Sequence, residues 1–141
     1  MKPTLHLLCG LPGSGKTTLA KELEMSQYAL RLCVDEWMIR LGMDGHDEVK
    51  RALIEAVQWD ISQRALGLGV SVILEWGFWS RKERKRLRTQ AAALGADTKL
   101  HYLAVSQDEL VKRLNLRNAA LSEDSFRVDP AQMDEWFAVF E

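Results

Sequence analysis

The residues best suited to chemistry lie near the N-terminus, in the segment Gly10-Leu11-Pro12-Gly13-Ser14-Gly15-Lys16-Thr17-Thr18. Its first eight residues fit the pattern G-x-x-x-x-G-K-[ST] at every position. Glycine allows backbone conformations that larger residues avoid, so successive N–H groups can point at one phosphate. Lys16 would contact the β- and γ-phosphates of a nucleotide, the Thr17 hydroxyl would bind a magnesium ion between them, and Thr18 would hydrogen-bond the α-phosphate. The predicted phosphate-binding residues are Gly10, Gly13, Ser14, Gly15, Lys16, Thr17 and Thr18.

The elements expected on either side of this segment are those that a phosphate-binding loop requires. Residues 4–9 form a short apolar run typical of a buried strand. From residue 15 or 16 to residue 25, Leu19, Ala20 and Leu23 recur at helical spacing. A helix that begins where the glycines end adds its positive dipole end to the site. The alternative is a glycine-rich turn with an accidental Lys-Thr. It does not explain why a predicted strand precedes the glycines and a predicted helix follows them.

Two carboxylates follow predicted strands and are candidates for the chemistry. Asp35 follows the apolar run 29–34, and Glu75 follows the β-branched run 70–74. Asp35 is placed to take the proton from an attacking hydroxyl. Glu75 is placed to hold magnesium directly or through water, although it is one methylene longer than the more usual Asp. The alternative for either carboxylate is a helix cap or a solvated strand end.

Strands alternate with helices along the chain, which predicts an α/β fold with a mostly parallel sheet and helices on both faces. The 141 residues contain no linker or internal repeat, so we expect a single domain over 1–141. The S-x-x-E patterns at Ser80 and Ser106 predict helix starts. The other predicted elements are a helix over 47–68, a strand over 99–105, helices that end near 94 and 118, and a last helix from Asp129-Pro130.

Composition limits the classes of function. The formal net charge of −1 gives no global basic field that would attract nucleic acid or an anionic membrane. No apolar run approaches the roughly 18 residues of a membrane span, and the N-terminus lacks a signal-like segment, so we expect a cytoplasmic protein. We interpret Cys9 and Cys33 as reduced core residues; the alternative for Cys9 is a catalytic thiolate.

Several segments together resemble a known group. They are G-L-P-G-S-G-K-T-T at 10–18, V-D-E-W at 34–37, V-I-L-E-W-G-F-W-S-R-K-E-R at 72–84, L-H-Y-L-A-V at 100–105 and D-E-L-V-K-R-L-N-L-R-N at 108–118. This combination resembles the small AAA-type P-loop ATP-binding proteins described as predicted kinases, which are similar in fold to polynucleotide 5′-kinases, zeta toxins, chloramphenicol phosphotransferase and gluconate kinase. The resemblance implies a three-layer P-loop NTPase fold with strand order 2-3-1-4-5. It also implies ATP with magnesium, transfer of the γ-phosphoryl group to a hydroxyl, and a base at Asp35.

Arginines after the fourth predicted strand match the position of the lid in these kinases. Arg113 and Arg117 are one helical turn apart and share a helix face. As lid residues they would stabilise charge on the transferring phosphoryl group. The alternative is an ordinary solvated helix face. Arg127 is a weaker candidate for the same role.

The sequence leaves two possible roles open for a group of cations and for a group of aromatic residues, and it indicates no metal-binding role for the histidines. The cations of residues 81–88 would hold an anionic acceptor or form a solvated helix face; they are Arg81, Lys82, Arg84, Lys85, Arg86 and Arg88. Aromatic residues after the second and third strands would wall the acceptor site or cap the core; they are Trp37, Trp76, Phe78 and Trp79. His6, His46 and His101 do not have metal-ligand spacing.

The chain departs from the family at its C-terminal end, where 125–128 is the one segment available for a fifth strand. The guanine-reading pattern N-K-x-D does not occur, which favours ATP over GTP. The leading hypothesis is an ATP- and magnesium-dependent kinase that acts on a hydroxyl of a small molecule or a nucleotide end. The alternatives are a nucleotide-dependent switch or regulatory ATPase without a small acceptor, and a degenerate nucleotide-binding module.

Overall fold

The computed structural model describes residues 2–10, 15–77, 80–103 and 107–119. Strands and helices alternate along the chain, with one additional helix after the second strand. The elements are β1 (Thr4–Cys9), α1 (Lys16–Gln27), β2 (Leu30–Cys33), α2 (Val34–Arg40), α3 (Glu48–Gly67), β3 (Val72–Gly77), α4 (Arg81–Ala93), β4 (Asp97–Tyr102) and α5 (Gln107–Ala119).

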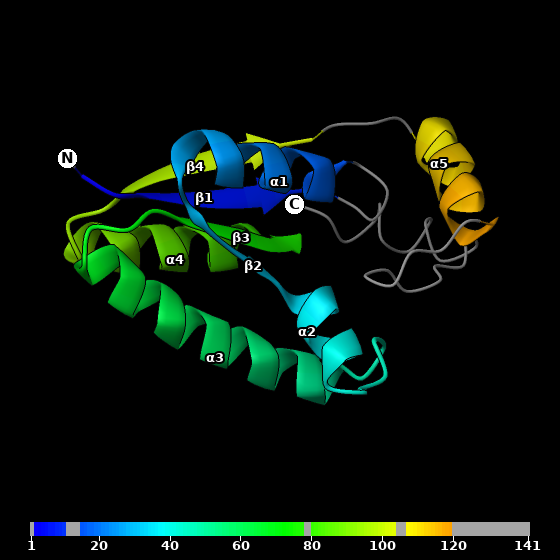
Figure 1. Ribbon diagram of the computed structural model, residues 1–141, viewed down its shortest axis with the longest axis horizontal. Helices are drawn as coiled ribbons and strands as arrows, with labels where there is room; N and C mark the ends of the chain where they lie inside the picture. Colours follow the sequence, from blue (N-terminus) through cyan, green and yellow to red (C-terminus); the bar gives the residue numbers. More distant parts are fainter. Residues whose placement is uncertain (1, 11–14, 78–79, 104–106, 120–141) are drawn as a thin grey trace.

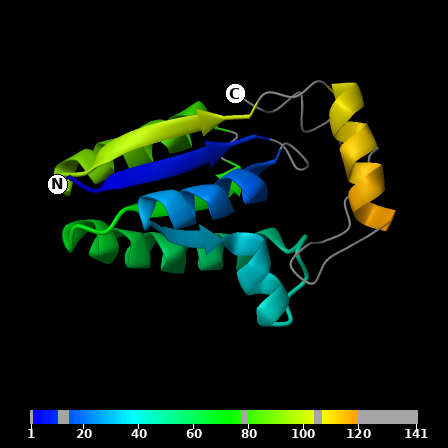
Figure 2. The same cartoon turned by 45° about the horizontal axis from the view of Figure 1, so that its top comes forward.

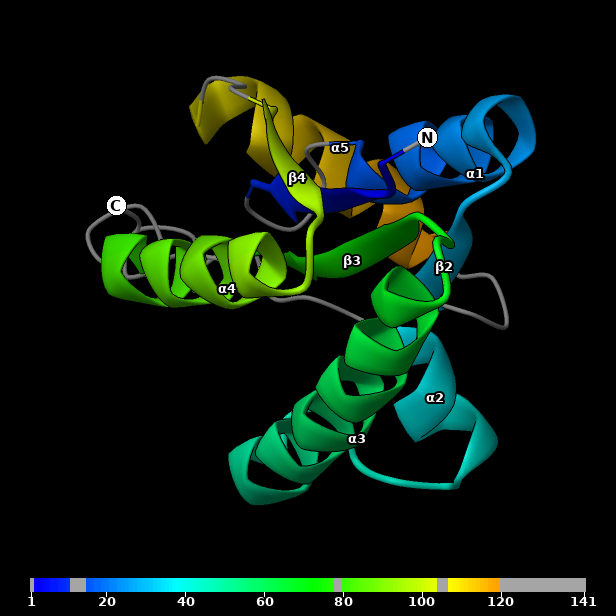
Figure 3. The same ribbon diagram turned by 90° about the vertical axis from the view of Figure 1, so that its left-hand side faces the viewer.

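Within the described residues, four parallel strands form the central sheet in the order β2-β3-β1-β4. Leu7 of β1 is in register with Leu74 of β3 and Leu100 of β4, so the strands end along one carboxyl edge. Helices α3 and α4 lie on one face of the sheet and α1 lies on the other (Figure 1), and the view along the strands separates these layers (Figure 3). The predicted α/β class and the order 2-3-1-4 are confirmed.

The core lies on both faces of β1. Leu7 packs with Leu74 of β3 and Leu87 of α4, whereas Leu8, on the opposite face, packs with Ala20 of α1 and Ile73 of β3. Because both faces of β1 and β3 are buried, their sequences are nearly continuous apolar runs and do not alternate between apolar and polar residues.

The two cysteines are free and buried, as predicted. Burial raises the pKa of Cys9 to about 11 and that of Cys33 to about 12. A thiol with a raised pKa is a poor nucleophile near neutral pH. The core interpretation of both cysteines is therefore confirmed, and the catalytic alternative for Cys9 is disfavoured.

The largest departure from the sequence analysis is α2, which begins at Val34. Asp35 was expected to end a strand, but it lies in the first turn of this short helix. Val34 and Met38 are one helical turn apart and both are fully buried against Ile54 of α3. Tertiary packing of this kind stabilises a helix that is too short to be stable alone.

Side chains cap two of the described helices, at Asp47, which the sequence analysis did not predict as a cap, and at Ser80, which it did. The Asp47 side chain accepts a hydrogen bond from the Lys50 backbone N–H at the start of α3, and Ser80 does the same for Glu83 at the start of α4. The predicted start at Ser106, the 125–128 strand and the helix from Asp129 lie outside the described residues. None of the described helices is long and apolar enough to span a membrane.

A histidine pair makes the stability of this fold depend on pH. His6 Nδ1 of β1 lies 3.0 Å from His101 Nε2 of β4, and His6 is 4% exposed. Burial, helped by the nearby charges of His101 and Lys99, lowers the pKa of His6 to about 4. The unfolded chain, with an ordinary histidine pKa, therefore binds more protons between pH 4 and pH 6.5, and the folded state loses stability as the pH falls through that range.

We expect the free energy of unfolding to fall by about 2 kcal/mol between pH 7 and pH 5 through His6 alone. Urea denaturation of wild type and His6→Gln at both pH values isolates this contribution, because Glu55, whose pKa burial raises to about 7, acts in the opposite direction in both proteins. His46 is exposed and serves as the matched control, since His46→Gln should keep the wild-type pH dependence. An equal pH dependence in wild type and His6→Gln would contradict this account.

Candidate functional site

The two ends of the phosphate-binding segment have the predicted structure. β1 leads to Gly10, which is buried, and α1 begins at Lys16. Gly15 precedes the helix with a φ of 101°, a left-handed conformation that strains any residue with a Cβ. Gly13 and Ser14 lie outside the described residues. The strand before the segment and the helix after it are thus the two elements that a P-loop needs.

The Lys16 side chain reaches back to the end of β1. Its Nζ donates a hydrogen bond of 2.7 Å to the carbonyl oxygen of Gly10. The ammonium group is therefore held between the strand end and the helix start, at the N-terminal end of α1. A positive charge at a helix N-terminus provides two sources of attraction for an anion, the ammonium group and the helix dipole.

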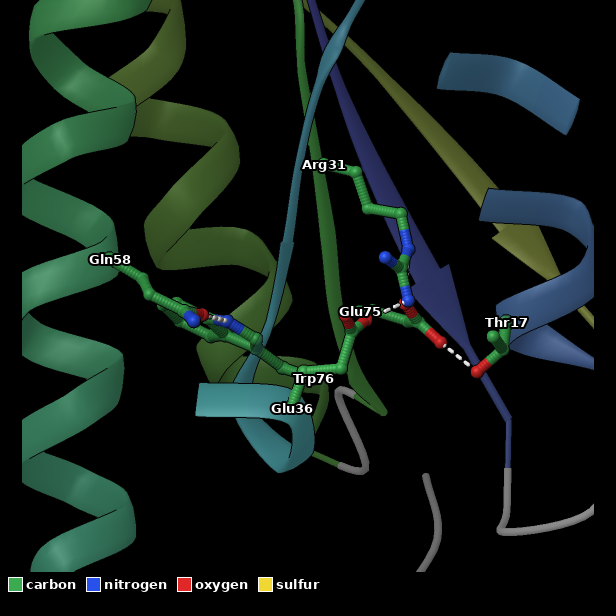
Figure 4. A network of polar contacts seen from close by, with 6 residues as sticks. All are labelled: Thr17, Arg31, Glu36, Gln58, Glu75 and Trp76. Atoms are coloured by element: carbon green, nitrogen blue, oxygen red, sulfur yellow. Dashed lines mark hydrogen bonds and ion pairs between the residues drawn. The ribbon is translucent and has the colours of Figure 1, made fainter. Parts of the chain in front are cut away.

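Thr17 and Glu75, both predicted to hold magnesium, are in direct contact. The Thr17 hydroxyl of α1 donates a hydrogen bond to Glu75 Oε1 at the carboxyl end of β3 (Figure 4). A hydroxyl has one proton, so donation to the carboxylate leaves its lone pairs to face a cation. Hydroxyl and carboxylate oxygens are the ligands that Mg²⁺ prefers, so this pair fits the predicted ion.

Arg31 of β2 completes this contact, and the sequence analysis did not single it out. Its Nε lies 3.1 Å from Glu75 Oε2, and its Nη2 forms an ion pair with Glu36 of α2 (Figure 4). The side chains of Arg31 and Glu75 are 10% and 3% exposed. Burial alone would lower the pKa of Arg31, but the charges of Glu75 and Glu36 outweigh burial and raise it.

Asp35, the predicted base, has an arginine partner that the sequence analysis also missed. Its Oδ1 lies 2.5 Å from Nη2 of Arg51 on α3, and the same Nη2 donates to the Gly45 carbonyl oxygen at 3.0 Å. The Asp35 and Arg51 side chains are 47% and 31% exposed. Partly exposed pairs of this kind contribute little to stability and can exchange partners readily.

One turn beyond Arg51 on α3 is Glu55, a half-buried carboxylate that faces α4. Burial and then the nearby charge of Glu83 raise the pKa of Glu55 to about 7. Glu83 also has a raised pKa, with burial as the main cause. Two neighbouring carboxylates, one on α3 and one on α4, therefore bind protons more tightly than usual.

The predicted lid arginines lie on or beyond α5, which stands past the carboxyl ends of the strands (Figures 1 and 2). Arg113 is exposed, and its Nε pairs with Glu109 Oε1 at 3.1 Å along the same helix. This contact is the one expected for a solvated helix face. The side chain of Arg117, and all of Arg127, lie outside the described part of the chain, so the lid role stays a prediction.

The other candidate groups have different environments. Thr18 is exposed in the first turn of α1. Trp37 and Trp76 are half-buried and pack against the core, and Trp76 Nε1 donates to Gln58 Oε1 at 2.8 Å, as expected for residues that cap the core. Phe78 and Trp79 lie outside the described residues. On α4, Arg84 is half-buried and the other cations of the basic run are exposed; they are Arg81, Lys82, Lys85, Arg86 and Arg88.

Comparisons with known proteins agree with this geometry. The sequence model of the AAA domain family AAA_33 matches residues 5–141, so the chain belongs to this family. No curated protein sequence matches the chain.

Solved structures show the same fold at low sequence identity. A chain of the Pnkp1/Rnl/Hen1 RNA repair complex has a TM-score of 0.82 and 20% identity over 96% of this chain, which spans only 43% of that one. Kti12 of Chaetomium thermophilum, solved with ADP-AlF3, has a TM-score of 0.70 and 21% identity over 97% of this chain and 80% of its own. A gluconokinase of Sinorhizobium meliloti 1021 has a TM-score of 0.67 and 16% identity over 99% of this chain and 76% of its own. The chain therefore has the fold of the P-loop kinases.

The left-handed conformation at Gly15 gives a direct test of the loop. We expect Gly15→Ala to lower the free energy of unfolding by about 1–2 kcal/mol and to weaken nucleotide binding, because a Cβ is strained at this φ. The strain is conformational, since the nearest atom to that Cβ would be Leu103 Cδ2 at an ordinary 3.6 Å.

Gly67 provides the matched control, because it ends α3 with helical geometry and open space where a Cβ would lie. Gly67→Ala should leave the stability unchanged or raise it slightly. Urea denaturation and calorimetric titration with ATP would measure both effects. Equal midpoints for the two variants would show that Gly15 is not strained.

Proposed function

We propose that this chain is an ATP- and magnesium-dependent kinase that transfers the γ-phosphoryl group of ATP to a hydroxyl of a small molecule or a nucleotide end. The contact between the Thr17 hydroxyl and Glu75, at the end of a P-loop, is the observation that carries this proposal. In this contact, the hydroxyl of a residue at the start of α1 lies against a carboxylate of the neighbouring strand β3. Proteins that bind a nucleotide with a metal ion use this arrangement to hold the ion.

The binding roles follow from position. The backbone N–H groups from Gly10 to Thr18 and the Lys16 ammonium hold the triphosphate. Thr17 would hold a magnesium ion, and Glu75 would hold it directly or through water; the ion would neutralise charge on the β- and γ-phosphates. Thr17 directs its proton to Glu75 and leaves its lone pairs for the ion.

Asp35 is the proposed base. The hydroxyl oxygen of the acceptor forms a bond to the γ-phosphorus, the bond from that phosphorus to the bridging oxygen breaks, ADP leaves, and Asp35 takes the hydroxyl proton. Arg51, 2.5 Å from Asp35, orients the carboxylate until an acceptor is present. Arg113 and Arg117 would stabilise the transferring group after a movement of α5 toward the loop.

The alternative function is a nucleotide-dependent switch or regulatory ATPase. The partly exposed Asp35–Arg51 pair favours the kinase, because it leaves a carboxylate within reach of an incoming hydroxyl. The solved relatives include an RNA repair complex and a gluconokinase, so both nucleic-acid ends and sugar-like molecules belong among the acceptors to be tested. A switch would hydrolyse ATP without stimulation by any of them and would bind a partner protein in an ATP-dependent way.

We expect Asp35→Asn to lower phosphoryl transfer by at least about 100-fold and to leave ATP binding unchanged, because the amide cannot take a proton. The measurement is transfer of labelled γ-phosphate to pooled metabolites, antibiotics and 5′-hydroxyl oligonucleotides, followed by assay of the acceptor so identified. Asp60 is exposed on α3, and Asp60→Asn should transfer at the wild-type rate. Undiminished transfer by Asp35→Asn would refute its assignment as the base.

A further inference from the structure

One buried guanidinium connects the two halves of the site. Arg31 of β2 contacts Glu75, which faces Thr17 of the nucleotide loop, and Glu36, which is next to Asp35 on α2. We propose that Arg31 is a positioning residue: it holds Glu75 against the Thr17 hydroxyl and ties that carboxylate to the helix that carries Asp35. This inference rests on the proposed function, because it assigns Arg31 a role in the same site.

The first step is electrostatic. Oxygen atoms of Glu36 and Glu75 and the Cys33 Sγ all lie within 4.8 Å of one another. Two carboxylates this close repel each other, and both are largely removed from water, with 22% and 3% of their side chains exposed. The guanidinium lies against both carboxylates and supplies the opposite charge that offsets this repulsion. Without it, the repulsion would push the two carboxylates apart.

The second step is geometric. Glu75 receives one donor on each oxygen, the Thr17 hydroxyl on Oε1 and Arg31 Nε on Oε2 (Figure 4). The arginine therefore fixes the rotation of the carboxylate, and the carboxylate in turn fixes where the Thr17 proton points. We infer that Glu75 also serves the metal ion by orienting Thr17. Partners of metal ligands commonly act in this way.

The third step concerns α2. Its N-cap residue, Cys33, has a thiol rather than one of the oxygen-bearing side chains preferred at this position. The ion pair from Arg31 to Glu36 instead anchors the first turn of this helix, in which Asp35 lies. A lysine would supply the charge but not the planar fork of donors that reaches two carboxylates at once.

Calorimetric titration with ATP, in EDTA and in Mg²⁺, tests this inference without any acceptor. In wild type, Mg²⁺ should tighten ATP binding, and the ratio of the two dissociation constants defines the magnesium gain. We expect Arg31→Met to reduce this gain by about 10-fold or more while binding in EDTA stays within about 2-fold, because the loop amides and Lys16 are intact. Arg40 is exposed at the end of α2, so Arg40→Met serves as the matched control and should keep the full gain.

A purely structural role gives a different result. If Arg31→Met weakens binding equally in EDTA and in Mg²⁺, or keeps the full magnesium gain, the proposal is wrong. If Arg31→Met does not fold, Arg31→Lys decides: we expect a partial loss of the gain, and a folded Arg31→Lys with the full gain would overturn the proposal.

The two experiments distinguish a failure of the kinase proposal from a failure of the role proposed for Arg31. A wild-type protein that shows the magnesium gain but transfers phosphate to no acceptor contradicts the kinase, while the role of Arg31 is still decided by the titrations. A protein that transfers phosphate, with the gain unaffected by Arg31→Met, contradicts the role of Arg31 alone.

Discussion

Charge compensation of Glu75 is the constraint on which the rest of this structure depends. Burying an ionised carboxylate costs several kcal/mol unless opposite charge and hydrogen-bond donors surround it. Glu75 has both, from Arg31 on β2 and Thr17 on α1. Because the three residues come from three elements, their contact fixes the position of α1 and β2 relative to β3. The same contact that makes the buried charge tolerable therefore sets the geometry of the phosphate-binding edge.

The parallel sheet explains why such a contact can form at all. β3 lies between β2 and β1, so Glu75 at its carboxyl end can meet a side chain from β2 and another from the helix that follows β1. Arg31 and Glu75 are on neighbouring strands, and the register pairs Cys33 with Glu75, so the arginine reaches along its own strand to the carboxylate. An antiparallel arrangement would place these strand ends at opposite edges.

The sequence indicated the residues around Thr17 and Glu75 more fully than those around Asp35, and physical reasons account for the difference. Glycines at fixed spacing and a β-branched run before Glu75 are local signals, so the elements that flank the glycine segment, and Thr17 and Glu75 as candidates, could be found from the residues alone. Arg31 and Arg51 could not, because each acquires its role from a partner on another element. The helix α2 has the signal of Val34 and Met38 one turn apart, but two residues do not separate a short helix from a strand end.

The two halves of the site also differ in how firmly they are held, and this difference suits phosphoryl transfer. On the nucleotide side, Arg31 and Glu75 are almost fully buried, and a buried ion pair resists rearrangement because breaking it leaves an unpaired charge in the interior. On the acceptor side, Asp35 and Arg51 are partly exposed, so their pairing is weak and water or a substrate hydroxyl can compete for it. A rigid side that fixes the triphosphate and an adaptable side that admits different acceptors would let one scaffold keep its nucleotide chemistry while its acceptor changes. In the role proposed for Arg31, its ion pair with Glu36 would hold the helix that carries Asp35 at a fixed position relative to Glu75.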